Sequence, residues 1–347
     1  MRRAQLARER RPVWPRRSET VDRRLTTVNC LPYATVNTDM RIAHLSDPHI
    51  LDLTGVDRSR LLLNKRFTGW VNIKLHRGSV HKRQVVEAMM DDIREQKVDH
   101  VVITGDITNL ALEPEFELAK SVFERLGFQP DQVSVIPGNH DVYTRGSERT
   151  RRFAQFFSQN ISSDLDVSSD HPSGPFPFVR LRGDAAIIGL STAVARLPLF
   201  ASGQAGKKQL DALVEVLEHP EVVKRTPVIL THHPLVNPPG FVATWTHGLV
   251  EATRIRKILH KRRHTVVLHG HLHDRAHRVL SQGGSTLHHL GATSASLLHR
   301  SPDRVAGYNV YDIGTAGLES VHARIYDAAN RLFVERNVPR KHAAFAT

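Results

Sequence analysis

Three histidines fall at every second position in the stretch LHGHLHD, which covers residues 268–274. On an extended strand, side chains two residues apart point to the same face, with Cα atoms about 6.6 Å apart. His269, His271 and His273 therefore have the spacing of a metal-binding strand end. The stretch alone does not say which of the three would bind an ion.

Polar side chains also follow four other expected strands, at the point where each strand ends. In an open α/β sheet, ligands bind at the carboxyl ends of the strands, so we expect these ends to meet. Five such ends in one chain indicate a site, because packing alone gives ionisable residues no reason to recur there. In chain order the ends supply Asp47 and His49, then Asp106, then Asn139, His140 and Asp141, then His232 and His233, and last His271 and His273.

The residue types favour a transition-metal centre. Cys30 is the single cysteine, so an internal disulfide and zinc sites built on several thiolates are excluded. Carboxylate and imidazole ligands suit manganese, iron or zinc, and two such ions about 3.5–4 Å apart can clamp an in-line displacement at phosphorus. Seven ligand candidates are too many for one tetrahedral ion and fit two ions that share a carboxylate: Asp47, His49, Asp106, Asn139, His232, His271 and His273.

Strands and helices that could position these residues alternate from Met40 onward. The alternation predicts one α/β domain with an added β-rich half, rather than two independent modules. Hydrophobic periodicity predicts helices at 84–96, 115–126, 208–217 and 249–260. It predicts strands at 40–46, 100–104, 132–136, 227–230 and 265–268, a hairpin at 178–190, and further strands at 286–290, 307–313 and 320–326.

The five polar clusters together resemble the complete signature of the calcineurin-like metallophosphoesterases. They read Asp47-Pro48-His49, Gly105-Asp106, Gly138-Asn139-His140-Asp141, His232-His233-Pro234 and Gly270-His271-Leu272-His273, in the family's order. The resemblance implies an α/β (α+β type) fold, a four-layer αββα sandwich in which helices flank two mixed β-sheets. We expect this domain to span residues 40–330, with a C-terminal tail at 331–347.

The resemblance also implies roles for the matching residues. Asp106 would bridge two divalent or mixed-valence ions of manganese, iron or zinc, and a metal-bridging hydroxide would attack phosphorus. His140 would stabilise the transition state or protonate the leaving oxygen, and Asp141 would orient His140. Asp47, His49, Asp106 and His273 would hold one ion, and Asp106, Asn139, His232 and His271 the other.

Three further polar residues near these motifs are expected to play lesser parts. His233 is not a ligand in this reading, because the family's ligand is the first histidine of the pair. His269 lies one step back toward the strand, and we expect it to be buried behind the ligands. Asn109 is interpreted only as a cap of the following helix.

The motifs define a reaction and leave its substrate open. The first choice is hydrolysis of a phosphodiester or phosphomonoester on a small anionic molecule. The overall length of the chain is loosely similar to that of the bacterial branch that includes cyclic-nucleotide phosphodiesterases. A nucleotide-lipid pyrophosphate hydrolase or a nuclease is an alternative. Aromatic residues are 6% of the chain and are not interleaved with arginine for base stacking, which argues against nucleic acid. A non-catalytic metal-binding scaffold is the alternative from a different class.

Charge and composition shape the remaining expectations. The formal net charge is +13, so anionic ligands are favoured. Residues 1–39 hold nine arginines and four acidic residues, and we expect a disordered tail; Met40 is a candidate start of translation.

The basic insertion 58–83 is interpreted as a helical element that packs its apolar face on the core. Peripheral contact with a membrane is the alternative function for this insertion. We expect a cytoplasmic protein, and the sequence does not indicate its oligomeric state.

Overall fold

The structure is a computed structural model that describes residues 39–56, 66, 81–198 and 200–342. These residues belong to one compact unit that spans Thr38–Thr347. The expected tail at 1–39, apart from Asp39, and most of the basic insertion at 58–83 lie outside the described residues.

Two six-stranded mixed sheets form the centre of this unit. The first has the order β14-β13-β12-β1-β2-β3, in which β1, β2 and β3 run parallel and the other neighbours are antiparallel. Its strands are β1 (Met40–Leu45), β2 (His100–Thr104), β3 (Val133–Ile136), β12 (Gly307–Gly314), β13 (Gly317–Asp327) and β14 (Leu332–Arg336).

The second sheet has the order β10-β11-β9-β8-β7-β6, with parallel pairing from β11 through β7. A separate two-stranded ladder joins β4 (Ser169–His171) to β5 (Gly174–Phe176). The strands of the second sheet are β6 (Phe178–Arg182), β7 (Ala185–Gly189), β8 (Thr226–Leu230), β9 (His264–His269), β10 (Ala276–Gln282) and β11 (Ser285–Gly291).

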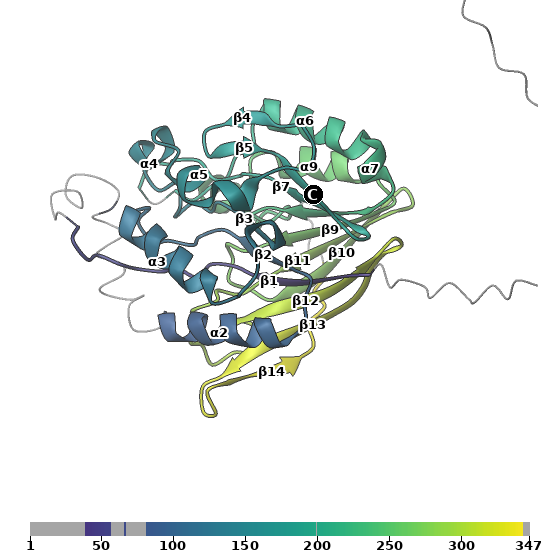
Figure 1. Cartoon of the computed structure of the whole chain (residues 1–347). Helices are drawn as coiled ribbons and strands as arrows, with labels where there is room; N and C mark the ends of the chain where they lie inside the picture. The colour runs from purple at the N-terminus through teal and green to yellow at the C-terminus, as the bar shows by residue number, and fades with distance from the viewer. Residues whose placement is uncertain (1–38, 57–65, 67–80, 199, 343–347) are drawn as a thin grey trace, which may run out of the picture. The chain divides into compact units, whose positions relative to one another are not determined.

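Helices cover the outer faces of both sheets. In Figure 1, α2 lies beside the first sheet, and α6, α7 and α9 lie on the opposite side beside the second. The fold is therefore the predicted sandwich of helices around two mixed sheets. The helices are α2 (Arg83–Glu95), α3 (Glu113–Glu124), α4 (Arg145–Arg149), α5 (Arg152–Phe157), α6 (Lys207–Glu218), α7 (Pro220–Val223), α8 (Phe241–His247) and α9 (Ala252–Leu259), with 3₁₀ turns at Pro130–Gln132 and Ser158–Ile161.

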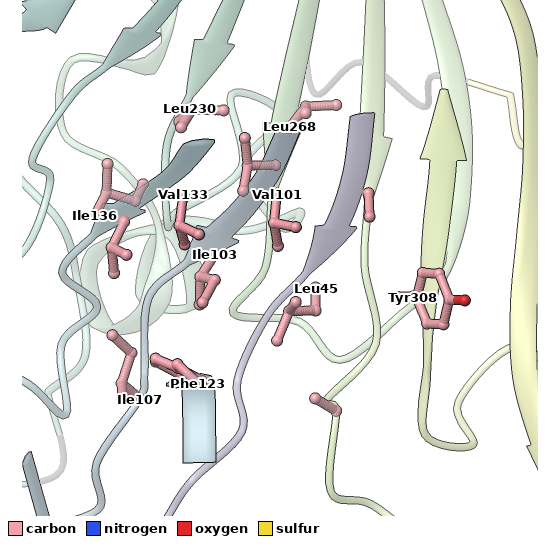
Figure 2. Packing of buried hydrophobic residues seen from close by; sticks show 14 of the residues in the cluster. Leu45, Val101, Ile103, Ile107, Phe123, Val133, Ile136, Leu230, Leu268 and Tyr308 are labelled. Carbon is pink, nitrogen blue, oxygen red and sulfur yellow. The ribbon is translucent and has the colours of Figure 1, made fainter. Parts of the chain in front are cut away.

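Side chains that alternate between the two faces of the second sheet show why the layers stack in this way. In β8, Val228 and Leu230 join the core of the first sheet, whereas Ile229 between them packs with α6 and α9. Successive strand residues point to opposite faces, so a buried strand supplies two cores at once. Figure 2 shows Leu230 of β8 and Leu268 of β9 in the cluster that also holds Val101 of β2.

The C-terminal strands show how the predicted β-rich half belongs to the single domain. In this half, β10 and β11 extend the second sheet, and β12 pairs with β1 in the first. The predicted C-terminal tail from 331 is wrong for residues 332–336, which form β14 on the edge of β13. Phe333 is buried there against Tyr326, and this packing fixes the strand.

Candidate metal centre

The parallel strands deliver their carboxyl ends to one place. Asp47 follows β1 and Asp106 follows β2, and the two loops are joined because the Asp47 N–H donates to the Gly105 carbonyl at 3.0 Å. The His49 N–H donates to the Asp106 carbonyl at 3.0 Å. Across the sandwich, the Gly270 N–H after β9 donates to the His232 carbonyl after β8 at 3.2 Å. The two sheets are linked by the bond from His232 to the Thr104 carbonyl, and the end of β3 joins them because the His140 backbone N–H donates to Asp106 Oδ1 at 2.7 Å. The five predicted strand ends thus lie together.

One group of side chains contains Asp47, His49 and His273. The Nε2 atom of His273 lies 3.0 Å from Asp47 Oδ1 and 3.2 Å from His49 Nε2. The second Asp47 oxygen accepts the backbone N–H of His271 at 3.0 Å. One ligand atom from each of the three side chains lies within 4.8 Å of the others, as one ion requires.

The second group contains Asp106, His232 and His271, with Asn139 between the two rings. The Nε2 atom of His232 lies 3.2 Å from Asn139 Oδ1 and 3.4 Å from Asp106 Oδ2. The Nδ1 atom of His271 lies 3.1 Å from the same Asn139 oxygen. A third group, His49 with Asp106 and His140, connects this set to the first.

The hydrogen bonds on the far side of each ring show which nitrogen faces the site. His232 donates its Nδ1–H to the Thr104 carbonyl at 2.7 Å, and His271 donates its Nε2–H to the His247 carbonyl at 3.1 Å. In a neutral imidazole the other nitrogen carries a lone pair. The His271 lone pair then faces the Asn139 oxygen, which is also an acceptor. A cation satisfies both atoms, so the residues present fit a metal ion.

The charges in the site agree with this fit. Burial alone would raise the pKa of Asp106, but the neighbouring His232 and His140 rings outweigh it and hold that pKa well below its ordinary value. Burial would likewise lower the pKa of His232, yet Asp106 and Asp47 raise it to about 9. Burial and the charge of His232 lower the pKa of His271 to about 3, which keeps that ring neutral, as a metal ligand must be. The carboxylates therefore favour positive charge at the site.

Backbone strain is concentrated at the same residues. Five expected ligands have left-handed backbone angles, with φ between 48° and 66°, although none is glycine. Such conformations are uncommon for residues with a Cβ and cluster at functional sites, where surrounding contacts hold them. The five are Asp47, His49, Asp106, His271 and His273.

Glycines let these loops approach one another. A Cβ on Gly138 would overlap the carboxylate and backbone nitrogen of Asp106, and a Cβ on Gly270 would overlap Ser46 and the Asp47 carboxylate. Gly105 has φ 89° and would also meet the backbone of Gly138. The glycines in the sequence motifs are therefore needed for close packing of the loops that carry the expected ligands.

Replacing Gly138 by alanine should displace Asp106 and weaken metal binding. We expect a loss of roughly 1–3 kcal/mol in unfolding free energy, the usual cost of overpacking, together with a lower Mn²⁺ affinity. Denaturant unfolding and calorimetric titration with Mn²⁺ would measure the two effects.

Gly146→Ala is the matched control for Gly138→Ala. Gly146 lies in α4, and the added Cβ would be 3.6 Å from Oγ1 of the N-cap residue Thr144, an ordinary contact. Alanine is favoured over glycine in a helix by about 0.5–1 kcal/mol. Equal Mn²⁺ affinity in both variants would contradict the packing role assigned to Gly138.

His140 is oriented by a backbone carbonyl. Its Nδ1–H donates to the Asn109 carbonyl at 2.7 Å, and its ring stacks on Tyr143 at 5.2 Å between centroids. Asp141, expected to orient His140, instead accepts the backbone N–H groups of Ile107, Thr108 and Gly138 at 2.9–3.1 Å. The Asp141 carboxylate therefore holds the loops together, and Asn109 positions the His140 ring.

Asn109 is not the helix cap that the sequence predicted, because the residue at the N-cap of α3 is Leu112. The Asn109 side-chain Nδ2–H donates to the His49 carbonyl at 2.5 Å, across 60 residues of sequence. The buried Glu115 accepts the backbone N–H groups of Asn109, Leu110 and Leu112. This network fixes one expected ligand and one expected catalytic residue relative to each other.

Two histidines of the motifs face away from the centre. Both ring nitrogens of His233 are used, by Thr192 Oγ1 at 2.8 Å and by the Ala201 carbonyl at 2.8 Å. His269 is buried, stacks on His289 with centroids 4.2 Å apart, and donates to the Gly270 carbonyl at 3.1 Å. These positions agree with the expectation that neither is a ligand.

Two residues near the centre were missed by sequence reasoning. His81 packs edge-on to His49 with ring centroids 5.2 Å apart, and its Nδ1 lies 2.7 Å from Ser296 Oγ. Tyr143 lies four residues after Asn139 and stacks on His140. His81 belongs to no motif, so nothing in the sequence marked it, whereas the nearness of Tyr143 to the third motif was a usable signal.

The helices that the structure describes include none that is both long and apolar enough to span a bilayer.

Comparisons with known proteins give a consistent picture. The family model for calcineurin-like phosphoesterases matches residues 40–275. A dimetal phosphatase from Danio rerio is similar in structure, with a TM-score of 0.50 and 11% identity, covering 86% of this chain and 99% of that one. Purple acid phosphatase PPD1 from yellow lupin (Lupinus luteus) has a TM-score of 0.51 and 11% identity, over 88% of this chain and 54% of that one. A search of curated proteins gave no match.

Proposed function

The chain belongs to the calcineurin-like phosphoesterase family and is a metal-dependent phosphoric ester hydrolase, and from this premise we propose that it hydrolyses a small phosphodiester or phosphomonoester at the candidate metal centre. The observation that carries the proposal is the pair of largely buried Asp and His groups joined through Asp106 and His49. The proposed ligands are Asp47, His49, Asp106 and His273 for one ion, and Asp106, Asn139, His232 and His271 for the other.

The donor set supports manganese, iron or zinc, because it combines carboxylate, amide and imidazole atoms without thiolate. When bound, two such ions would supply Lewis acidity toward the phosphoryl oxygens and lower the pKa of a water nucleophile. The protein contributes the fixed, buried positions of the side chains, so that little reorganisation is needed during the reaction.

His140 is the proposed general acid. Its Nδ1–H is held by the Asn109 carbonyl, so Nε2 is the nitrogen that can pass a proton to a substrate oxygen. In the overall reaction, a water oxygen bonds to phosphorus, the bond from phosphorus to the alcohol oxygen breaks, and that oxygen takes up a proton from His140. The proton that the water loses then restores the protonated form of His140. Stacking on Tyr143 restricts the ring to this orientation.

Asn109→Ala should reduce kcat/KM and Mn²⁺ affinity by about 10- to 100-fold, the usual effect of removing a partner of a metal ligand. The variant loses the bond to the His49 carbonyl, so the loop bearing that ligand is less well fixed. Titration calorimetry with Mn²⁺ measures an effect that general destabilisation alone would not produce.

Asn160→Ala is the control for Asn109→Ala. Asn160 also donates its side-chain amide to backbone carbonyls, those of Pro130 and Val133, but in another part of the fold. We expect comparable losses of stability in both variants and normal Mn²⁺ affinity only in Asn160→Ala. Weakened Mn²⁺ binding in both would refute the positioning role of Asn109.

A substrate panel tests the proposed function. Protein loaded with Mn²⁺ is assayed on bis(4-nitrophenyl) phosphate, 4-nitrophenyl phosphate, 3′,5′- and 2′,3′-cyclic nucleotides and a nucleotide-lipid. Turnover of an ester above the His140→Ala background supports hydrolysis, and the preferred member defines the substrate class. Absence of turnover on every member would favour the non-catalytic scaffold.

A further inference from the structure

A pocket adjoins the candidate metal centre, beside His140. Its volume is about 520 Å³, within the range of small-molecule sites, and Tyr143 and Thr144 line one side of it. Tyr143 is the residue whose ring stacks on His140. The pocket therefore begins beside the proposed general acid, where part of a bound substrate would lie.

The far wall of the pocket is apolar and aromatic. It contains Leu197, Pro198, Phe200 and Trp245, and the last two rings meet edge to face with centroids 4.8 Å apart. The loop is tied to α8 by the Ala201 N–H, which donates to the Thr246 carbonyl at 2.8 Å. The metal centre also contacts α8, through the bond from His271 to the His247 carbonyl.

The apolar surface continues out of the pocket. On α8, Phe241 and Val242 precede Trp245 by four and three residues, which places all three on one helix face. The exposed fractions are 84% for Phe241, 71% for Val242, 61% for Trp245 and 68% for Leu197. Large apolar groups this exposed commonly mark a binding surface.

Two arginines provide a charge that suits an anionic group. Arg145 and Arg196 both line the pocket. The Arg196 guanidinium is bonded to Ser202 and Gln204. The side chain of the exposed Arg145 makes no hydrogen bond or ion pair with another residue that the structure describes, so its guanidinium can contact an anion in the pocket.

We propose that this pocket binds the apolar chain of an amphiphilic phosphate ester, with the phosphate at the metal centre and the chain against Leu197, Phe200 and Trp245. The inference rests on the proposed function and names its substrate class. An amphiphile fits because the apolar surface extends beyond the pocket, over Phe241 and Val242, where an alkyl chain can continue. A flat nucleobase would stack on Phe200 and Trp245 and would leave that outer surface uncovered. Arg145 contacts the charged head of the same molecule.

Alkylphosphonates test the proposal without turnover. Methyl-, butyl- and octylphosphonate, used below their micellar concentrations, are titrated into the Mn²⁺-loaded full chain by calorimetry. A buried methylene is worth about a fourfold gain in affinity at full burial, so octylphosphonate should bind at least about tenfold more tightly than methylphosphonate. Adenosine 5′-monophosphate, titrated in the same way, represents the nucleobase alternative.

Surface variants locate the effect. Trp245→Ala and Leu197→Ala should each remove most of the gain from chain length, whereas Leu332→Ala, an exposed leucine on β14, should retain it. Arg145→Gln should weaken all three phosphonates alike, and Arg149→Gln in the same helix should not. Chain-independent affinity, an unchanged gain in Trp245→Ala, or tighter binding of the nucleotide than of octylphosphonate would each overturn the proposal.

The same samples separate this inference from the proposed function. Hydrolysis of bis(4-nitrophenyl) phosphate with chain-independent phosphonate binding would defeat the amphiphile assignment alone. Chain-dependent binding without hydrolysis of any ester would defeat the hydrolase proposal and leave the pocket assignment standing.

Discussion

Replacing Asp106 by alanine is expected to release both metal ions and to lower kcat by at least about 10³, since several kcal/mol of transition-state stabilisation depend on the ions. Asp106 lies in two of the ligand groups, 3.4 Å from His232 Nε2, and its other oxygen accepts the His140 N–H at 2.7 Å. In the proposed ligand sets Asp106 belongs to both ions, so removing this carboxylate would take a ligand from each ion and would also delete negative charge. Plasma mass spectrometry of the variant and its turnover of an aryl phosphodiester would measure both losses.

Two further variants make the Asp106 result interpretable. Asp106→Asn keeps a side-chain oxygen that can accept the backbone N–H of His140, and it replaces the alanine variant in these measurements if that variant does not fold. Asp131→Ala removes an exposed carboxylate in the 3₁₀ turn Pro130–Gln132, which precedes β3, and this variant should retain metal and activity. A folded Asp106 variant that still bound two ions would contradict the bridging position.

His140→Ala should separate catalysis from metal binding. We expect kcat to fall by about 10²–10⁴, the range for loss of a general acid, while both ions stay bound because His140 is not among the proposed ligands. The effect should be largest for esters with poor leaving groups, such as alkyl phosphates, and smallest for nitrophenyl esters, whose oxygen needs less protonation.

His299→Ala is the control for His140→Ala, since His299 is exposed and its Nδ1 accepts the N–H of the nearby Ser301 at 2.9 Å. Its kinetics should match those of the unaltered protein. Equal losses for good and poor leaving groups in His140→Ala would argue against proton donation and for a purely electrostatic role.

The meeting of the strand ends could be predicted because it depends on local patterns, whereas the sandwich of two sheets was expected only from the resemblance to the phosphoesterase family. Short apolar runs followed by polar residues mark buried parallel strands and their carboxyl ends. The order of strands within each sheet could not be predicted in this way. β12 lies more than 260 residues after β1 yet pairs with it, and no local pattern encodes such a partner.

Contacts made by backbone atoms were the main omission at the site. The sequence marked His140 and Asp141 as neighbours in a motif, but Asn109 holds the His140 ring through its main-chain carbonyl. A carbonyl can come from any residue type, so composition and spacing carry no signal for it. The same holds for the Thr104 and His247 carbonyls, which orient His232 and His271.

The pocket beside α8 was also outside what the sequence could predict. Trp245 and Leu197 are 48 residues apart, and neither segment shows a motif. Their proximity depends on the second sheet, whose loops bring both segments to the side of the metal centre.

The metal content of the purified chain tests the central claim most directly. Protein prepared without chelator, or stripped and reconstituted with Mn²⁺, is analysed by plasma mass spectrometry against protein concentration. The proposed ligand sets predict about two transition-metal ions per chain, as a two-metal mechanism requires. A value that stays at one or below after reconstitution would contradict the dinuclear centre.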